Sequence, residues 1–292
     1  MPFSTLWINN SFIQKENYAK SIQEKKIVFT SGSNTLYGME TNIIEKELGI
    51  PTVNMAIHAG LKTEYILYRA KNILNSGDII VLPMEYQNLT WNGDIETTYR
   101  DYVLTHDKEY LKKLSIKEQF SFISSITPYT LIKSLIEQKR TLIEPEIGRA
   151  YNSNTLNKNG DETYKEGTKA GFKIIPFVLL EQYDIETYGL LKIKEFSKWC
   201  KENNITLYVT FPNTVDLKEY YEEPYTGYFN FLLEYFNKNN IKVIGKATDS
   251  LYPIDHFYDT HYHMNSNGAK IRTYEFLDKF KKQIRVYDLD KL

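Results

Sequence analysis

The apolar and polar positions in the first third of the chain predict strands that alternate with helices. Short apolar runs are typical of buried strands, and three of them occur here: residues 27–29, 51–55 and 78–82. The segments between them carry apolar residues at three- and four-residue spacing, which predicts helices over 39–48 and 63–74. This alternation favours a parallel sheet covered by helices, with the carboxyl ends of all strands at one edge.

The same alternation returns in the last third of the chain. The pattern predicts helices over 188–203, 221–237 and about 267–284, and strands over 205–211 and 241–244. We expect the last helix to bury four residues on one face: Ile271, Tyr274, Leu277 and Phe280. The sheet is therefore expected to continue into the C-terminal part of the chain.

Between these two regions the pattern loosens, from about residue 84 to residue 173. Its first part has the spacing of several short helices, and the polar stretch 151–171 is typical of a mobile loop. We expect this region to be an insertion that caps the edge where the strands end. The predicted organisation is an N-terminal segment over 1–26 and a single α/β domain over 27–292 that carries the insertion.

Composition and charge exclude several classes of function. With 42% hydrophobic and 25% charged residues the chain is an ordinary folding sequence, and its formal charge of −1 without a long basic block predicts no nucleic-acid partner. The single cysteine, Cys200, excludes an internal disulfide and a thiolate-rich zinc site, and its apolar helical spacing predicts a packed side chain. Neither a metal nor a cofactor is expected.

Two short motifs carry candidate chemistry. In "SGSNTLYG", Ser33 follows the first predicted strand and begins a helical segment, at the edge where parallel sheets bind ligands. The motif "FYDTHYHMNSNG" places Asp259, His261 and His263 just before the last helix, which returns to that edge. A serine nucleophile needs a base, and the base needs a carboxylate that fixes its tautomer. Taken alone, the Ser33 motif also fits an ordinary strand-to-helix turn, and the Asp/His motif also fits a solvated or capping loop.

These residues resemble a known family. The motifs "SGSNTLYG", "VNMAIHAG" and "YHMNSNG" resemble blocks one, two and five of the SGNH, or GDSL-type, hydrolases. The resemblance implies a flavodoxin-like three-layer α/β/α sandwich with a mainly parallel sheet. It also implies Ser33 as nucleophile, His263 as base and Asp259 as the orienting carboxylate. Asp259 lies four residues before His263, where the family has three, and an Asp-x-His pair as in some related acetyltransferases would instead select His261 as base.

The resemblance is weaker for the groups that bind the oxyanion. The block-two glycine corresponds to Ala56, whose backbone N–H would donate to the oxyanion. The block-three Gly-x-Asn-Asp is absent, and "VLPMEYQN" places Glu85 and Tyr86 near its expected position. Asn34 and His58 complete the candidate oxyanion and substrate-binding residues, and a structural, hydrogen-bonded role for His58 is the alternative.

Within the superfamily the chain most resembles bacterial envelope proteins encoded beside polysaccharide machinery. This implies an O-acetyltransferase or acetylesterase that acts on a cell-envelope polysaccharide or exopolysaccharide, with an oligosaccharide acceptor and a membrane-bound acyl-transfer partner. It also implies an extracytoplasmic domain with a membrane anchor just before Pro2, or a cytoplasmic protein if Met1 is the native start. The alternative function is a non-catalytic, carbohydrate-binding relative, because block three is missing.

Overall fold

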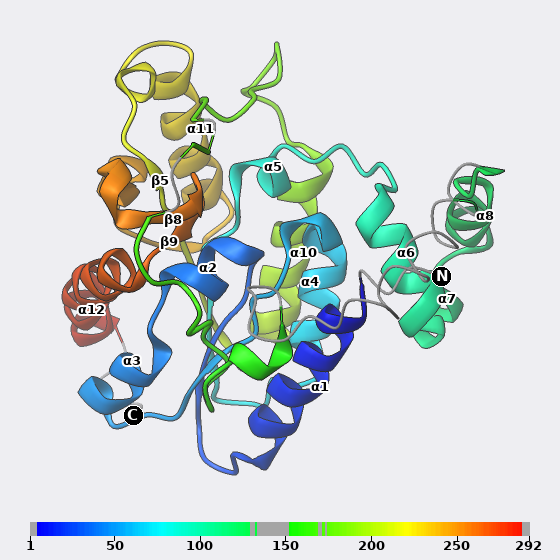
Figure 1. The fold of residues 1–292 in the computed structure, drawn as a ribbon, viewed down its shortest axis with the longest axis horizontal. Coiled ribbons are helices and arrows are strands. Elements are labelled where there is room, and N and C mark those ends of the chain that lie inside the picture. Colours follow the sequence, from blue (N-terminus) through cyan, green and yellow to red (C-terminus); the bar gives the residue numbers. More distant parts are fainter. Residues whose placement is uncertain (1–4, 129–131, 133–151, 169–170, 173, 288–292) are drawn as a thin grey trace.

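The computed structural model of the chain describes residues 5–128, 132, 152–168, 171–172 and 174–287. Most of the helical pattern over 129–140 (residues 129–131 and 133–140) and the start at Met1 and Pro2, from which an anchor is predicted, lie outside the described residues. The chain folds around a parallel sheet flanked by helices (Figure 1).

Five parallel strands form the central sheet, in the order β2-β1-β3-β4-β6. Their bounds are β1 (Ile27–Phe29), β2 (Thr52–Asn54), β3 (Ile79–Leu82), β4 (Thr206–Thr210) and β6 (Lys242–Ile244). In register, Val28 lies beside Val53 on one side and Ile80 on the other. Counted along the sheet this order is the flavodoxin-like one, so the predicted fold class is confirmed.

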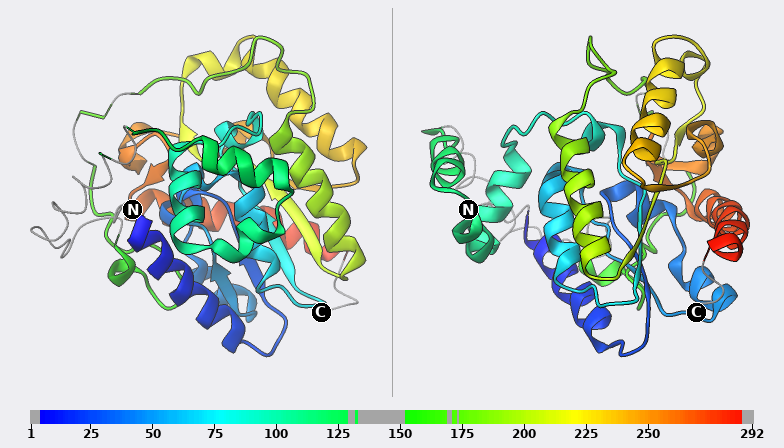
Figure 2. Two further views of the ribbon diagram at one scale, coloured as in Figure 1. Left: turned by 90° about the vertical axis from the view of Figure 1, so that its right-hand side faces the viewer. Right: turned by 180° about the vertical axis from the view of Figure 1, so that it is seen from behind.

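Helices cover both faces of the sheet, as Figures 1 and 2 show. One core cluster joins Val28 to residues of α1 (Leu6–Ser21), α4 (Lys62–Lys71), α10 (Tyr188–Glu202) and α11 (Tyr225–Lys238). The other joins Ile27 and Phe29 to α3 (Thr41–Leu48) and α12 (Ser266–Tyr287). Successive residues of β1 thus face opposite helical layers, as the two-residue period of a strand requires. Because α1 contributes Ile8 and Phe12 to the first cluster, the N-terminal segment packs in the core of the domain.

One residue of a predicted core face is wrong. On α12, Leu277 and Phe280 are buried as predicted and Ile271 is partly buried, whereas Tyr274 is 52% exposed. Phe276 and Arg272 are buried as well, and the ring of Phe276 packs edge-on against Phe29 at 5.2 Å. A buried arginine breaks the apolar pattern from which the face was predicted.

Over residues 84–128, which the structure describes, the insertion contains four short helices. They are α5 (Tyr86–Leu89), α6 (Thr97–His106), α7 (Lys108–Lys113) and α8 (Ile116–Ser124). Figure 2 shows α6, α7 and α8 extending away from the sheet. The start of α6 nevertheless contacts the turn after β2, because a Cβ on Gly60 would lie 3.1 Å from Cβ of Thr98.

The polar segment 152–168, predicted to be a mobile loop, is instead packed into the fold. Its backbone bonds to three elements: Asn54 N–H donates to Asn159 O (2.8 Å), Glu162 N–H to Leu36 O (3.1 Å), and Ser266 N–H to Lys165 O (3.2 Å). Four of its polar side chains are buried: Asn159, Asp161, Glu162 and Lys165. The expectation failed because these side chains are paired inside the protein, which composition alone does not reveal.

The remaining described elements are short. They are η2 (Ala59–Leu61), η3 (Ser153–Thr155), β5 (Thr214–Val215), η4 (Lys218–Tyr221), η5 (Ala247–Ser250), β7 (Leu251–Tyr252), η6 (Ile254–His256), β8 (Phe257–Thr260) and β9 (His263–Met264). Among the described residues, none of the helices has the length and apolar character needed to span a bilayer.

Candidate active site

A two-stranded hairpin positions the Asp/His pair. Strands β8 and β9 pair antiparallel, with a register irregularity between Phe257 and Thr260. The Thr260 hydroxyl accepts the backbone N–H of His263 (3.1 Å), which tightens the turn. His263 Nδ1 then donates to Asp259 Oδ1 at 2.8 Å. This bond leaves the lone pair of the neutral ring on Nε2, the tautomer that a general base for serine requires.

The helix that begins with Ser33 lies directly against this imidazole. Helix α2 (Ser33–Gly38) carries Ser33 and Tyr37 four residues apart, and such residues share one helix face. The Tyr37 ring stacks on the His263 ring, with centroids 4.2 Å apart and planes within 10°. Ser33, which is partly exposed, therefore lies on the face that contacts His263. Figure 1 shows α2 beside β8 and β9, so the helix that begins with Ser33 lies next to the strands that carry Asp259 and His263.

His261, the alternative base, is placed differently. In the described part of the chain the ring hydrogen bond of Asp259 goes to His263 and not to His261. Burial, and then the proximity of His263, lower the pKa of His261. The geometry therefore favours His263 as the base.

A close approach of three segments forms the turn before Ser33. A Cβ on Gly32 would lie 2.4 Å from both Ala59 N and Glu85 Oε1, so only glycine fits there. The buried Glu85 carboxylate accepts the N–H of Gly32 (2.9 Å) and of Asn34 (3.0 Å). Neither Ser33 N–H nor Ala59 N–H donates to an acceptor in the described part of the chain, which leaves both for an oxyanion.

Four of the predicted oxyanion or substrate-binding residues have other roles. Ala56 N–H donates to Asn54 Oδ1 (3.1 Å), so it is not available to an oxyanion, whereas Ala59 N–H in the same turn is. Glu85 is an acceptor and cannot donate to an oxyanion. Asn34 is fully buried, and its side-chain amide donates to Pro83 O (2.8 Å). Tyr86 is also buried, stacked on Phe177 with centroids 4.0 Å apart.

A buried arginine links the serine helix to the histidine loop. The Arg272 guanidinium donates to Asn34 O (3.2 Å) and to Asn213 Oδ1. The Asn213 amide in turn donates to Tyr262 O (2.7 Å), one residue before His263. This chain of hydrogen bonds fixes the residue after Ser33 relative to the residue before the base. Sequence reasoning missed both residues, since neither lies in a recognisable motif.

Two further residues were missed, although a signal for them exists. Tyr37 lies one helical turn after Ser33, a spacing that predicts a shared face. Ala59 lies three residues beyond the predicted donor Ala56 in the same "VNMAIHAG" motif. The sequence does not reveal which residue of this motif approaches Gly32, because that depends on how the turn folds.

Other reactive groups lie apart from this site. Cys200 is buried, as predicted, and burial raises the pKa of its thiol to about 12. Within the described ranges no group of three or more His, Cys, Asp or Glu side chains is placed to hold a metal ion.

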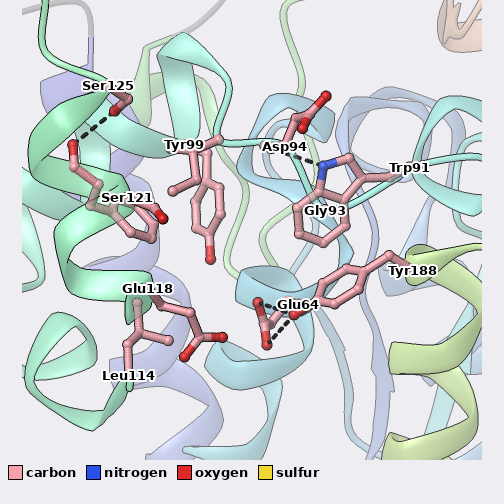
Figure 3. Close-up of a pocket in the computed structure, with 12 residues that line it drawn as sticks. Glu64, Trp91, Gly93, Asp94, Tyr99, Leu114, Glu118, Ser121, Ser125 and Tyr188 are labelled. Carbon is pink, nitrogen blue, oxygen red and sulfur yellow. Dashed lines mark hydrogen bonds between the residues drawn. The ribbon is translucent and has the colours of Figure 1, made fainter. Parts of the chain in front are cut away.

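A separate pocket of about 430 Å³ lies between the insertion helices and the α4–α10 layer (Figure 3). None of the triad residues lines it, whereas Glu64, Glu118 and Tyr188 do. Its polar groups are largely bonded to one another or to nearby residues: Trp91 Nε1 donates to Asp94 O (2.9 Å), and Glu64 pairs with Lys192 (3.0 Å). We assign the candidate chemistry to the triad and not to this pocket.

No protein-family model and no curated protein matches the chain. Solved structures of similar shape include the acetyl xylan esterase AlAXEase, with 11% identity over 87% of this chain and 98% of that chain, at a TM-score of 0.44. A catalytic mutant of the acetylxylan esterase Axe2 from Geobacillus stearothermophilus has 13% identity over 87% and 93%, at 0.43. A putative acylhydrolase from Bacteroides fragilis NCTC 9343 has 11% identity over 98% of both chains, at 0.42. Because these identities and TM-scores are low, the matches carry no argument about activity, and we assign activity from this chain's own residues.

Proposed function

We propose that this chain is a serine-dependent acyl-transfer enzyme of the SGNH type, an acetylesterase or O-acetyltransferase. The observation that carries the proposal is the Asp259–His263 hydrogen bond of 2.8 Å, together with the stacking of the His263 ring on Tyr37, which lies in the helix that begins with Ser33. A carboxylate, an imidazole and a hydroxyl in this order are what nucleophilic acyl transfer requires.

In the proposed reaction Ser33 Oγ attacks the carbonyl carbon of an acetyl ester while His263 Nε2 takes the hydroxyl proton. The carbonyl oxygen becomes an oxyanion that Ser33 N–H and Ala59 N–H stabilise. The ester C–O bond then breaks, and the leaving alcohol takes the proton from His263 Nε2. Water or a second hydroxyl attacks the acetyl-serine by the same steps in reverse. Water as acceptor makes the enzyme an esterase, and a sugar hydroxyl makes it a transferase.

We further propose that the substrate is a bacterial envelope polysaccharide or exopolysaccharide, and that the domain works outside the cytoplasm on a membrane anchor. Both proposals derive from the resemblance of the three motifs to envelope members of the superfamily. A membrane-bound protein would then supply the acyl group. Fractionation of cells that express the full native gene tests the location, and recovery in the cytosol would contradict it.

The triad is tested by substitution and by a serine-directed phosphonate probe. Ser33→Ala should abolish covalent labelling. His263→Ala should lower turnover of a chromogenic acetyl ester by about 10⁴ or more, and Asp259→Asn by less, because the base survives without its fixed tautomer. His261→Ala should retain most activity. An inactive His261→Ala beside a mildly affected His263→Ala would show that the base is His261.

A non-catalytic, carbohydrate-binding protein is the second candidate. The observation that favours it is Glu85, an acceptor near the position where the family has a side-chain oxyanion donor. Wild-type protein that binds a glycan but neither labels nor turns over any acyl ester would support this alternative. Release of acetate with and without oligosaccharide acceptors separates an esterase from a transferase.

A further inference from the structure

The oxyanion site built from Ser33 and Ala59 has two backbone donors and lacks a side-chain donor from Glu85, which is an acceptor. We propose that His58 supplies the third donor, through the Nε2–H of a neutral imidazole. This inference rests on the proposed function, because it adds a residue to the same reaction.

The tautomer of His58 follows from its hydrogen bond. Gly60 N–H donates to His58 Nδ1 at 3.0 Å, and an acceptor nitrogen carries no proton. In the neutral ring the proton is therefore on Nε2, which makes that atom a donor. Glycine is needed at position 60, since a Cβ there would lie 2.9 Å from both Cε1 and Nδ1 of His58. The turn thus holds the ring in a single tautomer.

The position of His58 places this donor at the reacting group. The next residue, Ala59, has its backbone N and Cα against Gly32, which precedes the nucleophile. The imidazole is partly exposed and packs edge-on against the Trp7 ring, with centroids 6.2 Å apart. It is also close enough to His263 for the charge of that ring to affect it. His58 therefore shares the site with the nucleophile and the base.

Burial and two nearby positive side chains favour the neutral form of His58. Burial is the main factor that lowers the pKa of His58, to about 4, and the charges of His263 and Lys62 lower it further. Lys62 pairs with Glu96 at 2.5 Å, so that carboxylate is already engaged. At His263, Asp259 accepts the Nδ1–H, so the lone pair is on Nε2. The two imidazoles thus have different roles in the proposed reaction: His263 is the base that takes a proton, and His58 is a donor that stays neutral. A neutral imidazole acts as an electrophile in other enzymes.

A competing donor is Gln87, whose exposed side-chain amide lies two residues after Glu85 in α5. Its location after β3 is close to where the family's side-chain donor is expected. His58 is the stronger candidate because its backbone neighbour contacts Gly32 and its ring neighbours His263. The two residues are distinguished by substitution.

Two isosteric variants of His58 separate the donor from the structural role. His58→Asn keeps an acceptor for Gly60 N–H but has no group at the Nε2 position. His58→Gln places an amide N–H near that position. With a chromogenic acetyl ester, we expect His58→Asn to lower kcat by about 10² to 10³, with KM changed by less than about threefold. His58→Gln should recover a substantial part of this loss, and Gln87→Ala should stay within about threefold of wild type. Comparison of His58→Leu with His58→Gln gives the same contrast if the Asn variant does not fold.

Phosphonate labelling separates failure of the inference from failure of the proposed function. Under the inference, His58→Asn still reaches one label per chain, only more slowly, because Ser33 and His263 are intact. A kcat for His58→Asn within threefold of wild type would overturn the inference, as would a loss of about 10² in Gln87→Ala alone. Wild-type protein without labelling or turnover would overturn both the proposed function and the role of His58.

Discussion

Two parts of the insertion, α8 and the segment 152–168, differ in the side chains that they expose and bury. On α8, three apolar residues at helical spacing face outward: Ile116, Phe120 and Ile123 are 86%, 69% and 56% exposed. In the segment 152–168, by contrast, Asp161, Glu162 and Lys165 are nearly inaccessible. From the hydrophobic pattern alone, these apolar residues of α8 would be buried and the charged residues of 152–168 would be exposed.

The difference lies in hydrogen-bond partners. Asp161 accepts from Thr41 N–H (2.9 Å), Thr41 Oγ1 (2.8 Å) and Asn54 Nδ2 (2.9 Å), and Lys165 donates to Tyr37 O (2.9 Å). A buried charge is tolerated when its partners are as complete as these. The polar segment therefore packs as tightly as an apolar one. It also contacts the candidate site, since Tyr37 belongs to α2, the helix that begins with Ser33.

The largest effect is expected from Asp161→Ala. This change removes the common acceptor of Thr41, Asn54 and Asn157, and it takes the acceptor away from the N–H and the hydroxyl of the fully buried Thr41. Breaking such a buried network costs about 3–5 kcal/mol, which chemical denaturation measures as a lower free energy of unfolding. Glu166→Ala is the control in the same segment, since that side chain is exposed and should change stability by about 0.5 kcal/mol or less. Equal effects of the two substitutions would contradict a buried network.

Most of the sheet and its helices could be predicted because both follow hydrophobic periodicity. The expected strand over 78–82 is β3 (Ile79–Leu82), and the expected helix over 188–203 is α10 (Tyr188–Glu202). Periodicity fails where burial depends on polar partners, as at Arg272 on α12 and throughout the segment 152–168. The partners of those groups are distant in sequence, and a single sequence does not reveal them.

For the candidate site, the residues that lie in short motifs beside predicted elements could be predicted. Asp259 and His263 belong to one hairpin, and Ser33 follows the first strand. The proposed oxyanion donors could not be predicted, because they depend on which backbone N–H groups remain unbonded after folding. Ala56 and Ala59 look alike in sequence, but in the structure Ala56 N–H is bonded to Asn54 Oδ1, whereas Ala59 N lies against Gly32.

The buried charges near Asp161 also predict a dependence of stability on pH. Burial lowers the pKa of Lys15 to about 7, despite the opposing charges of Asp161 and Glu162. Between pH 7 and about 10.5 the unfolded chain therefore holds a proton on Lys15 that the folded chain lacks, so this group's contribution to stability rises with pH. The free energy of unfolding of wild type relative to Lys15→Met should increase by up to about 1.4 kcal/mol per pH unit in this window.

The control for this pH effect is Lys20→Met, on the same helix. The Lys20 side chain is 54% exposed, and its curve of unfolding free energy against pH should run parallel to that of wild type. A Lys15→Met curve that is also parallel to wild type would show that Lys15 is not deprotonated in the folded protein.

The smallest effect is expected on the outer face of α8. Phe120 is 69% exposed and Phe122, two residues later, is 2% exposed with its ring edge-on to Tyr99 at 4.9 Å. Phe120→Ala should therefore change the free energy of unfolding by about 0.5 kcal/mol or less, whereas Phe122→Ala should lower it by about 3–5 kcal/mol. Urea denaturation of both variants measures the difference. A large loss in Phe120→Ala would mean that this face is covered in solution. If a second copy of the chain covers it, the midpoint would also fall on dilution, because stabilisation by association grows with the logarithm of the protein concentration. A midpoint independent of concentration, together with a small loss, would leave α8 as an apolar surface that the fold tolerates because the buried side of the helix supplies its stability.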